Sequence, residues 1–241
     1  MAESTTVIAA LKFQGGVVIA ADSQASDTVA EVRWPVEKLD RIGMHPCVLG
    51  FSGAVSRAER ARNKLNSTPL HPNMFDKRER IEGAVYKCLS PIYKEIKQAN
   101  EGANWGYYLT SLWGLMALWA EEAPHILECG INGDCEFHEH FHAIGSGSKT
   151  AYAIYRTLGG KRLCSLDERW AVPVILRVLR TCVDVEVWGV SEPIFVWVIS
   201  TGRARELSAD EIQAHLQTVD EWEQGERSAF FAKAVISSED V

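Results

Sequence analysis

The sequence predicts an α+β protein with antiparallel sheets, from three observations. Runs rich in Val, Ile and Ala flank a tight turn near the start of the chain, which is typical of hairpin strands. Apolar residues recur at helical spacing in several later segments. The expected elements follow one another as strands, two helices, strands, two helices, a strand and a helix. This order favours antiparallel sheets over a βαβ array.

The first half of the chain begins with a hairpin and ends with two helices. Residues 6–13 and 17–21 are apolar strands joined by a turn at Gln14-Gly15-Gly16. Two more strands are expected at 38–42 and 48–52, and two helices at 53–65 and 78–98. The second helix contains Pro91, which is expected to kink it.

The second half repeats the pattern of strands followed by helices. Strands are expected within 107–119 and 125–143, around turns at Glu121-Glu122 and Asn132-Gly133-Asp134. The Asn132-Gly133 pair is a strong hairpin signal. The later elements are a helix at 148–158 ended by Gly159-Gly160, a helix within 167–183, a strand at 193–200 and a C-terminal helix capped by Ser208 and Glu211. Pro173 is expected to delay the start of the helix within 167–183.

Length, charge and cysteine content limit the class of protein. The 241 residues contain no internal repeat and no low-complexity linker, which favours one domain over two. The net charge of −7 argues against a general nucleic-acid binder, which usually presents a basic face. No apolar run is long enough to predict a membrane span. The six cysteines form no C-x-x-C pair and the N-terminus lacks a secretory signal, so reduced thiols and a cytoplasmic location are expected.

The segment from Thr6 to Ser26 closely resembles the start of a mature proteasome β-type subunit, and it is also similar to the bacterial HslV peptidase. Both belong to the N-terminal nucleophile (Ntn) hydrolases. Three further signatures of this family follow in order: Val36-Glu37-Lys38-Leu39, Phe51-Ser52-Gly53-Ala54 and Gly145-Ser146-Gly147-Ser148. The resemblance implies a four-layer αββα sandwich with two antiparallel central sheets and an active site at the edge between them. It also implies that residues 1–5 are a propeptide and 6–241 a single peptidase domain.

The chemistry of this family depends on a threonine at the first position of the mature chain. A threonine hydroxyl is a weak nucleophile until a base removes its proton. The free α-amino group of the first residue can be that base, because its pKa of roughly 7.7–8.0 lies near the working pH. A nearby lysine held by a carboxylate favours the neutral amine. A backbone N–H beside a glycine stabilises the oxyanion, which is worth roughly 10²–10³ in rate.

By resemblance, six residues take catalytic roles. Thr6 is the nucleophile, Asp22 orients Lys38, and Lys38 tunes the site. Gly53 supplies the oxyanion N–H. Ser146 and Asp184 complete the hydrogen-bond network around the amine. Taken one at a time, these residue types have ordinary roles, such as a turn aspartate or a surface lysine. Their order along the chain favours the catalytic interpretation.

The pocket for the residue before the scissile bond is inferred from the same resemblance. The lining residues implied are Ala25, Ser26, Phe51 and Val55. Because Phe51 is bulky, we expect a shallow pocket that prefers small residues.

The function expected is that of a threonine-type endopeptidase subunit in a stacked ring of identical chains, acting on proteins or peptides without a cofactor. An ATPase unfoldase ring is the partner that the resemblance implies for folded substrates. Two alternatives stay open: a catalytically inactive ring subunit, and an Ntn hydrolase that acts on small amides. Activity requires removal of residues 1–5. The family's processing usually cuts after a glycine, whereas Thr5 stands here, and whether Thr5 or Thr6 becomes the first residue is open.

One further segment is rich in histidine. The residues 136–142 are expected to form one strand, on which His138, His140 and His142 share a face. With Cys129 and Cys135 nearby, this face is a candidate zinc site. A strand with a polar face and no metal explains the same pattern.

Overall fold

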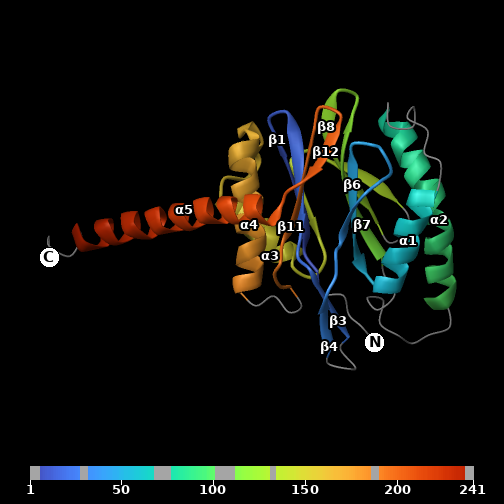
Figure 1. Ribbon diagram of the computed structural model, residues 1–241, viewed down its shortest axis with the longest axis horizontal. Helices are drawn as coiled ribbons and strands as arrows, with labels where there is room; N and C mark the ends of the chain where they lie inside the picture. Colours follow the sequence, from blue (N-terminus) through green and yellow to red (C-terminus); the bar gives the residue numbers. More distant parts are fainter. Residues whose placement is uncertain are drawn as a thin grey trace.

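Two five-stranded antiparallel sheets pack face to face between two layers of helices in the computed structural model (Figure 1). The structure describes residues 6–27, 32–67, 77–100, 112–130, 134–185 and 190–236. The propeptide expected at 1–5 and the predicted Asn132-Gly133 turn lie outside these residues. The α+β class and the four-layer sandwich expected from the sequence are confirmed.

The first sheet carries the N-terminal hairpin at its centre. Its strand order is β10 (Phe141–Ile144), β1 (Ile8–Phe13), β2 (Gly16–Ala21), β11 (Phe195–Ser200) and β12 (Arg203–Glu206). In β2, Val17 and Ile19 pack in the core between the sheets, whereas Val18 and Ala20 pack against helices. Every residue of β2 is therefore buried, which explains why its sequence is apolar throughout rather than alternating.

The second sheet contains the remaining long strands. Its order is β5 (Leu39–Arg41), β6 (Cys47–Gly53), β7 (Leu112–Ala120), β8 (Ala123–Cys129) and β9 (Cys135–His138). A separate hairpin of β3 (Gln24–Asp27) and β4 (Val32–Pro35) follows β2. The strands β3, β4 and β12 could not be predicted, because these four-residue segments lack the apolar pattern that marks a strand.

Helices cover the outer face of each sheet. The two that cover the second sheet are α1 (Val55–Ser67) and α2 (Arg78–Asn100), which contains Pro91. The elements that cover the first sheet are α3 (Ser148–Thr157), the 3₁₀ helix η3 (Gly160–Ser165) and α4 (Glu168–Asp184). Three apolar cores follow from these layers: one under each outer layer of helices and one between the sheets.

The expectation that Pro173 delays α4 is wrong. The helix begins at Glu168, and the side chain of Asp167 caps it by accepting a hydrogen bond from the Trp170 N–H at 3.2 Å. Pro173 lies inside the helix and is buried with eight other residues of α4. A proline inside a helix costs about 3 kcal/mol. Packing of this apolar helix against β1 and β2 outweighs that cost.

The expectation of one strand over 136–142 is also wrong. The strand β9 ends at His138 in the second sheet, and β10 begins at Phe141 in the first. The two phenylalanines explain the change of sheet. Phe137 packs beside the core under α1 and α2, whereas Phe141 stacks on Tyr155 of α3 with ring centroids 4.3 Å apart. One flat strand cannot place both rings in cores that lie on opposite sides of the sandwich.

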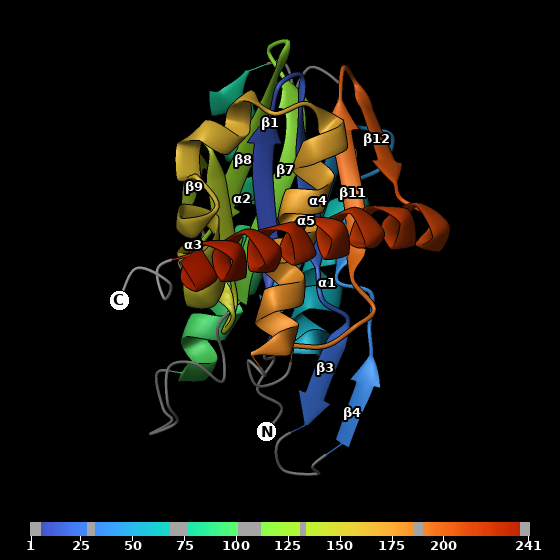
Figure 2. The same cartoon turned by 90° about the vertical axis from the view of Figure 1, so that its left-hand side faces the viewer.

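The last helix, α5 (Ala209–Ile236), crosses α4 and extends beyond the sandwich (Figures 1 and 2). The predicted capping box is present, since Ser208 Oγ accepts from the Glu211 N–H and Glu211 Oε2 accepts from the Ser208 N–H. Arg177 of α4 lies 4.1 Å from the Trp222 ring of α5 and pairs with Glu226. Among the described residues, no helix has the length and apolar character needed to cross a bilayer.

Candidate functional site

Thr6 lies two residues before β1, and its side chain is buried beside a lysine. Lys38 Nζ donates a hydrogen bond to Thr6 Oγ1 at 3.1 Å and lies 2.7 Å from Asp22 Oδ1. Asp22 directly follows β2 of the first sheet, and Lys38 directly precedes β5 of the second. The three residues are 5% exposed or less. The structure thus brings together Thr6, Asp22 and Lys38 at the edge between the sheets.

Asp22 is held rigidly by backbone donors as well as by the lysine. Its Oδ1 accepts from the Val7 N–H at 2.9 Å, and its Oδ2 accepts from the Gln24 N–H at 3.0 Å. Burial raises the pKa of the Asp22 carboxyl, and the nearby Lys38 opposes that rise. Burial lowers the pKa of the Lys38 ammonium, and Asp22 opposes that fall. Each charge therefore depends on the other, and the pair fixes the position of Lys38 Nζ next to the threonine hydroxyl.

The loop between β10 and α3 binds the backbone of Thr6. The Thr6 nitrogen lies 3.2 Å from Ser146 Oγ, and the Gly147 N–H donates to the Thr6 carbonyl at 3.2 Å. Gly145 has a φ of +92°, and a Cβ at this position would lie 2.1 Å from the Thr6 carbonyl oxygen. Only glycine permits this approach. The predicted Gly145-Ser146-Gly147 motif thus packs against the backbone of Thr6, and we call these three residues the seat of Thr6. Ser146 is the residue of the seat that contacts the Thr6 nitrogen.

Two residues that the sequence analysis did not single out complete this seat. Ser52, 3% exposed at the end of β6, has its Oγ 3.2 Å from the position of a Gly145 Cβ. Cys182 of α4 contacts the Gly147 carbonyl oxygen through its Sγ at 3.8 Å. Burial raises the pKa of Cys182 to about 12, and the Asp22 charge adds to this rise, so the thiol stays protonated. Ser52 could have been found because it belongs to the Phe51-Ser52-Gly53-Ala54 motif. The only sequence signal at Cys182 is the apolar spacing of a buried helix face.

Two predicted catalytic residues remain, Gly53 and Asp184, and they differ in their position relative to Thr6. Gly53 ends β6 with a φ of +131°, one residue after Ser52 and directly before the Ala54 that precedes α1. The Asp184 side chain is exposed at the last turn of α4, and no hydrogen bond or ion pair among the described residues joins it to Thr6 or Ser146. The structure therefore leaves Asp184 outside the cluster.

The residues predicted for the substrate pocket have unequal exposure. Ala25 in β3 is buried, and Val55 at the start of α1 is half-buried. The Phe51 side chain is 4% exposed and packs in the core under α1 and α2. Ser26 pairs with Arg33 in the β3–β4 hairpin, and its side chain lies outside the described part of the chain.

The sandwich and the threonine at the edge between its sheets define the Ntn-hydrolase fold. The chain belongs to the proteasome subunit family, because a model of that family, described as "Proteasome subunit", matches residues 1–192. The family resemblance seen in the sequence is thereby confirmed. A search of curated protein sequences gave no match.

Among solved structures, the chain is similar to two Anbu proteins. One is an Anbu (Gly-1) mutant from Hyphomicrobium sp. strain MC1, with a TM-score of 0.70 and 16% identity over 93% of this chain and 96% of that one. The other is Anbu, described as an ancestral beta-subunit, from Yersinia bercovieri, with a TM-score of 0.72, 13% identity and the same coverage. At this level of identity the likeness supports the fold.

Proposed function

We propose that this chain is a threonine-type endopeptidase subunit of a proteasome-like ring of identical chains in the cytoplasm. The observation that carries the proposal is the 3.1 Å hydrogen bond from Lys38 Nζ to Thr6 Oγ1, made by a lysine that is itself paired with buried Asp22. A cation next to a hydroxyl favours its deprotonated form and so makes the oxygen a better nucleophile. An ordinary core threonine has no need of a buried ion pair.

The proposed reaction begins when Thr6 Oγ attacks the carbonyl carbon of a substrate peptide bond. The proton of the hydroxyl passes to the free α-amine of Thr6, and the carbonyl oxygen becomes an oxyanion that the Gly53 N–H stabilises. The C–N bond then breaks, and the leaving amine takes the proton from the Thr6 ammonium. Water hydrolyses the resulting ester, which frees the Thr6 hydroxyl and the acid product.

The proposal requires cleavage of the bond between Thr5 and Thr6. In the chain as printed, the Thr6 nitrogen is a peptide nitrogen, and an amide is not a base near neutral pH. After cleavage the same atom is an amine that still lies beside Ser146 Oγ, which is 3.2 Å away. Ser146 thus contacts the Thr6 nitrogen in the uncleaved chain, and we propose that it does so in the cleaved chain as well.

We propose assembly into a ring for two reasons: the chain belongs to the proteasome subunit family, and a peptidase with an open active site would degrade other proteins of the cytoplasm. One chain of 241 residues cannot enclose a chamber, whereas a closed ring of identical subunits can. An ATPase ring that unfolds substrates is the partner we propose when the substrate is a folded protein.

The test combines three measurements on tag-free protein. Intact mass gives the first residue, native mass gives the assembly, and hydrolysis of casein and fluorogenic peptides gives the activity. We expect a chain that starts at Thr6, a multimeric mass and hydrolysis that Thr6→Ala abolishes. Ser67→Ala, at an exposed position far along α1, is the matched control and should remain active.

The other outcomes separate the two remaining functions. A multimeric chain that keeps Thr5 and lacks activity indicates a structural ring subunit and refutes the peptidase proposal. A chain that starts at Thr6 but hydrolyses only small amides, and not casein or peptides, indicates an amidase and also refutes it.

A further inference from the structure

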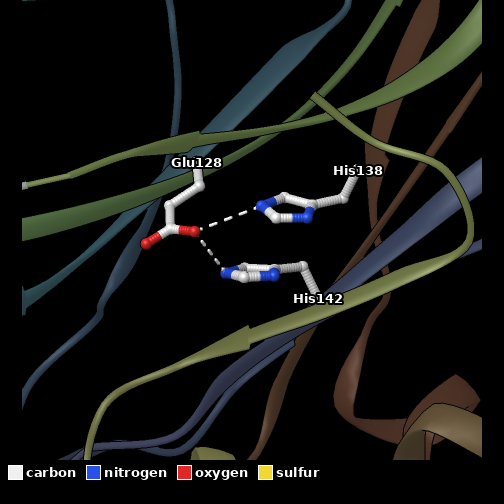
Figure 3. Close-up of side chains that lie close together, drawn as sticks. All are labelled: Glu128, His138 and His142. Atoms are coloured by element: carbon white, nitrogen blue, oxygen red, sulfur yellow. Dashed lines mark hydrogen bonds and ion pairs between the residues drawn. The ribbon is translucent and has the colours of Figure 1, made fainter. Parts of the chain in front are cut away.

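The structure gathers a glutamate and two histidines at the edge of the layer between the sheets. Glu128 lies on β8, His138 ends β9 and His142 lies on β10, so the side chains come from both sheets. Figure 3 shows the two imidazole rings extending toward the Glu128 carboxylate. Glu128 Oε2 lies 3.1 Å from His138 Nε2 and 2.8 Å from His142 Nε2. These three residues lie on three different strands, and they form one cluster in the folded chain.

The register of the strands explains why these side chains meet. Ile126 pairs with His138, and Ile126 belongs to the core between the sheets, so Glu128 and His138 share that face of the second sheet. His142 pairs with Ala10, which belongs to the same core. All three side chains therefore point into the space between the sheets, at its edge.

The same register excludes the other ligands expected from the sequence. Cys129 and Cys135 pair with each other, but they pack with the core on the opposite face of the second sheet, under α1 and α2. His140 lies in the turn between β9 and β10, where its side chain is 43% exposed and faces Glu139. Three of the ligands suggested by the sequence, Cys129, Cys135 and His140, therefore lie outside the cluster. Glu128, which lies inside it, was not predicted.

We propose that Glu128, His138 and His142 bind one divalent transition-metal ion of the zinc type, with the fourth position open to water. Two imidazole nitrogens and one carboxylate oxygen are a known donor set for zinc with an open position. The three donor atoms already lie within 4.8 Å of one another. This site is separate from the proposed peptidase function and does not depend on processing at Thr6.

The spacing of the donors is close to what an ion requires. Ligand atoms at 2.0–2.1 Å from a tetrahedral zinc ion are about 3.3 Å apart. The observed separations of 2.8 and 3.1 Å need to open by only a few tenths of an ångström. The two imidazole rings are now stacked, with centroids 3.6 Å apart and an angle of 14° between their planes. To bind the ion, the His138 ring rotates out of this stack so that its Nε2 lone pair and that of His142 converge.

A contact behind the cluster holds one ligand in the required orientation. Tyr152 of α3 places its hydroxyl 2.7 Å from His142 Nδ1. This hydrogen bond engages the nitrogen that faces away from the carboxylate and leaves Nε2 pointing at Glu128. Histidine ligands of metals regularly have such a partner on the second ring nitrogen, and its loss typically costs 10–100-fold in metal affinity.

The position of the cluster suggests what a bound ion does. His142 is three residues before Gly145, which lies against the Thr6 carbonyl. An ion held by β8, β9 and β10 joins the two sheets directly upstream of the loop that seats Thr6. Its effect is therefore to steady this edge of the sandwich.

The experiment measures zinc binding by the full, tag-free chain after dialysis against a chelator. Calorimetry with Zn²⁺ gives affinity and stoichiometry, and the absorption spectrum with Co²⁺ reports coordination by nitrogen and oxygen donors. We expect one ion per chain for the unaltered protein. Glu128→Gln, His138→Gln and His142→Gln should each weaken binding by more than 100-fold, and Tyr152→Phe by roughly 10-fold.

Matched controls separate this site from general binding by histidines and carboxylates. His140→Gln and Glu59→Gln, on side chains outside the cluster, should bind zinc like the unaltered protein; Glu59 is exposed on α1. Circular dichroism and thermal unfolding without metal check that each variant is folded, and Glu128→Gln changes no volume. The proposal is refuted if the unaltered chain binds no zinc at one ion per chain, or if the cluster variants bind as tightly as the two controls.

Discussion

The buried Asp22–Lys38 pair gives the sharpest prediction about stability. Replacing Lys38 by Met keeps an unbranched chain that lacks only the terminal nitrogen position, and it removes the cation that lies 2.7 Å from Asp22 Oδ1. Asp22 is fully buried, and among the described residues its carboxylate is then left with the two backbone donors of Val7 and Gln24. Removing one partner of a buried ion pair costs about 3–5 kcal/mol. For a chain of this length, that loss lowers Tm by roughly 6–20 °C.

The same variant has a characteristic dependence on pH. Without Lys38, the burial that raises the pKa of Asp22 is still opposed by the Val7 and Gln24 N–H donors but no longer by a cation, so the folded pKa rises further above its unfolded value of 3.8. An acid whose folded pKa is raised gives stability that is present at low pH and lost as the pH rises through the folded pKa. Lys38→Met should therefore recover stability relative to the unaltered protein as the pH falls from about 7 toward 5.

Thermal and urea unfolding at one fixed protein concentration test this prediction. Asp22→Asn/Lys38→Met removes both charges and should be more stable than Lys38→Met at neutral pH, without its recovery in acid. Lys161→Met, at an exposed position, is the matched control and should change stability by less than about 0.5 kcal/mol. A loss below about 1 kcal/mol in Lys38→Met, or a loss independent of pH, refutes the reasoning.

Three further predictions concern the seat of Thr6, the last helix and the substrate pocket. Gly145→Ala places a methyl group 2.1 Å from the Thr6 carbonyl oxygen and should abolish peptide hydrolysis and lower Tm. Gly43→Ala, also at positive φ but with no atom within 4 Å, should keep activity, and equal losses in the two variants would contradict the role of the clash. Ser208→Ala removes the cap of α5 and should cost about 1 kcal/mol in thermal unfolding, whereas Ser228→Ala, exposed within α5, should cost less; no difference between them argues against the capping box. A panel of fluorogenic peptides should show preference for a small residue before the scissile bond, and preference for a large aromatic residue would contradict the pocket inferred from Phe51.

The helices and the longer strands could be predicted because their signals are local. The apolar spacing of α1 and the capping residues of α5 act within one or two turns of helix, and both helices are present. The hairpin of β1 and β2 follows from two apolar runs and a glycine turn. The start of α4 was missed because the cost of Pro173 is local, whereas the packing that overcomes it comes from the first sheet.

The candidate site was predicted in part, and the difference has a physical reason. The order of Thr6, Asp22, Lys38 and the Gly145–Ser146 motif along the chain pointed to one centre, and the structure gathers these residues. Cys182 carries no signal beyond the spacing of an apolar helix face, and its contact with Gly147 exists only because α4 packs under the loop. Asp184 follows in the last turn of the same helix, yet it faces solvent.

The sequence by itself determined the family, the order of the helices and longer strands, and the neighbours of Thr6, because residue types and their spacing carry that information. The tertiary structure alone decided which distant side chains face each other. The chain changes sheets between His138 and Phe141, and this separates His140 from the other histidines and brings Glu128 to them. Such a crossing depends on the packing of Phe137 and Phe141 against different cores, which is a property of the packed layers rather than of any local pattern.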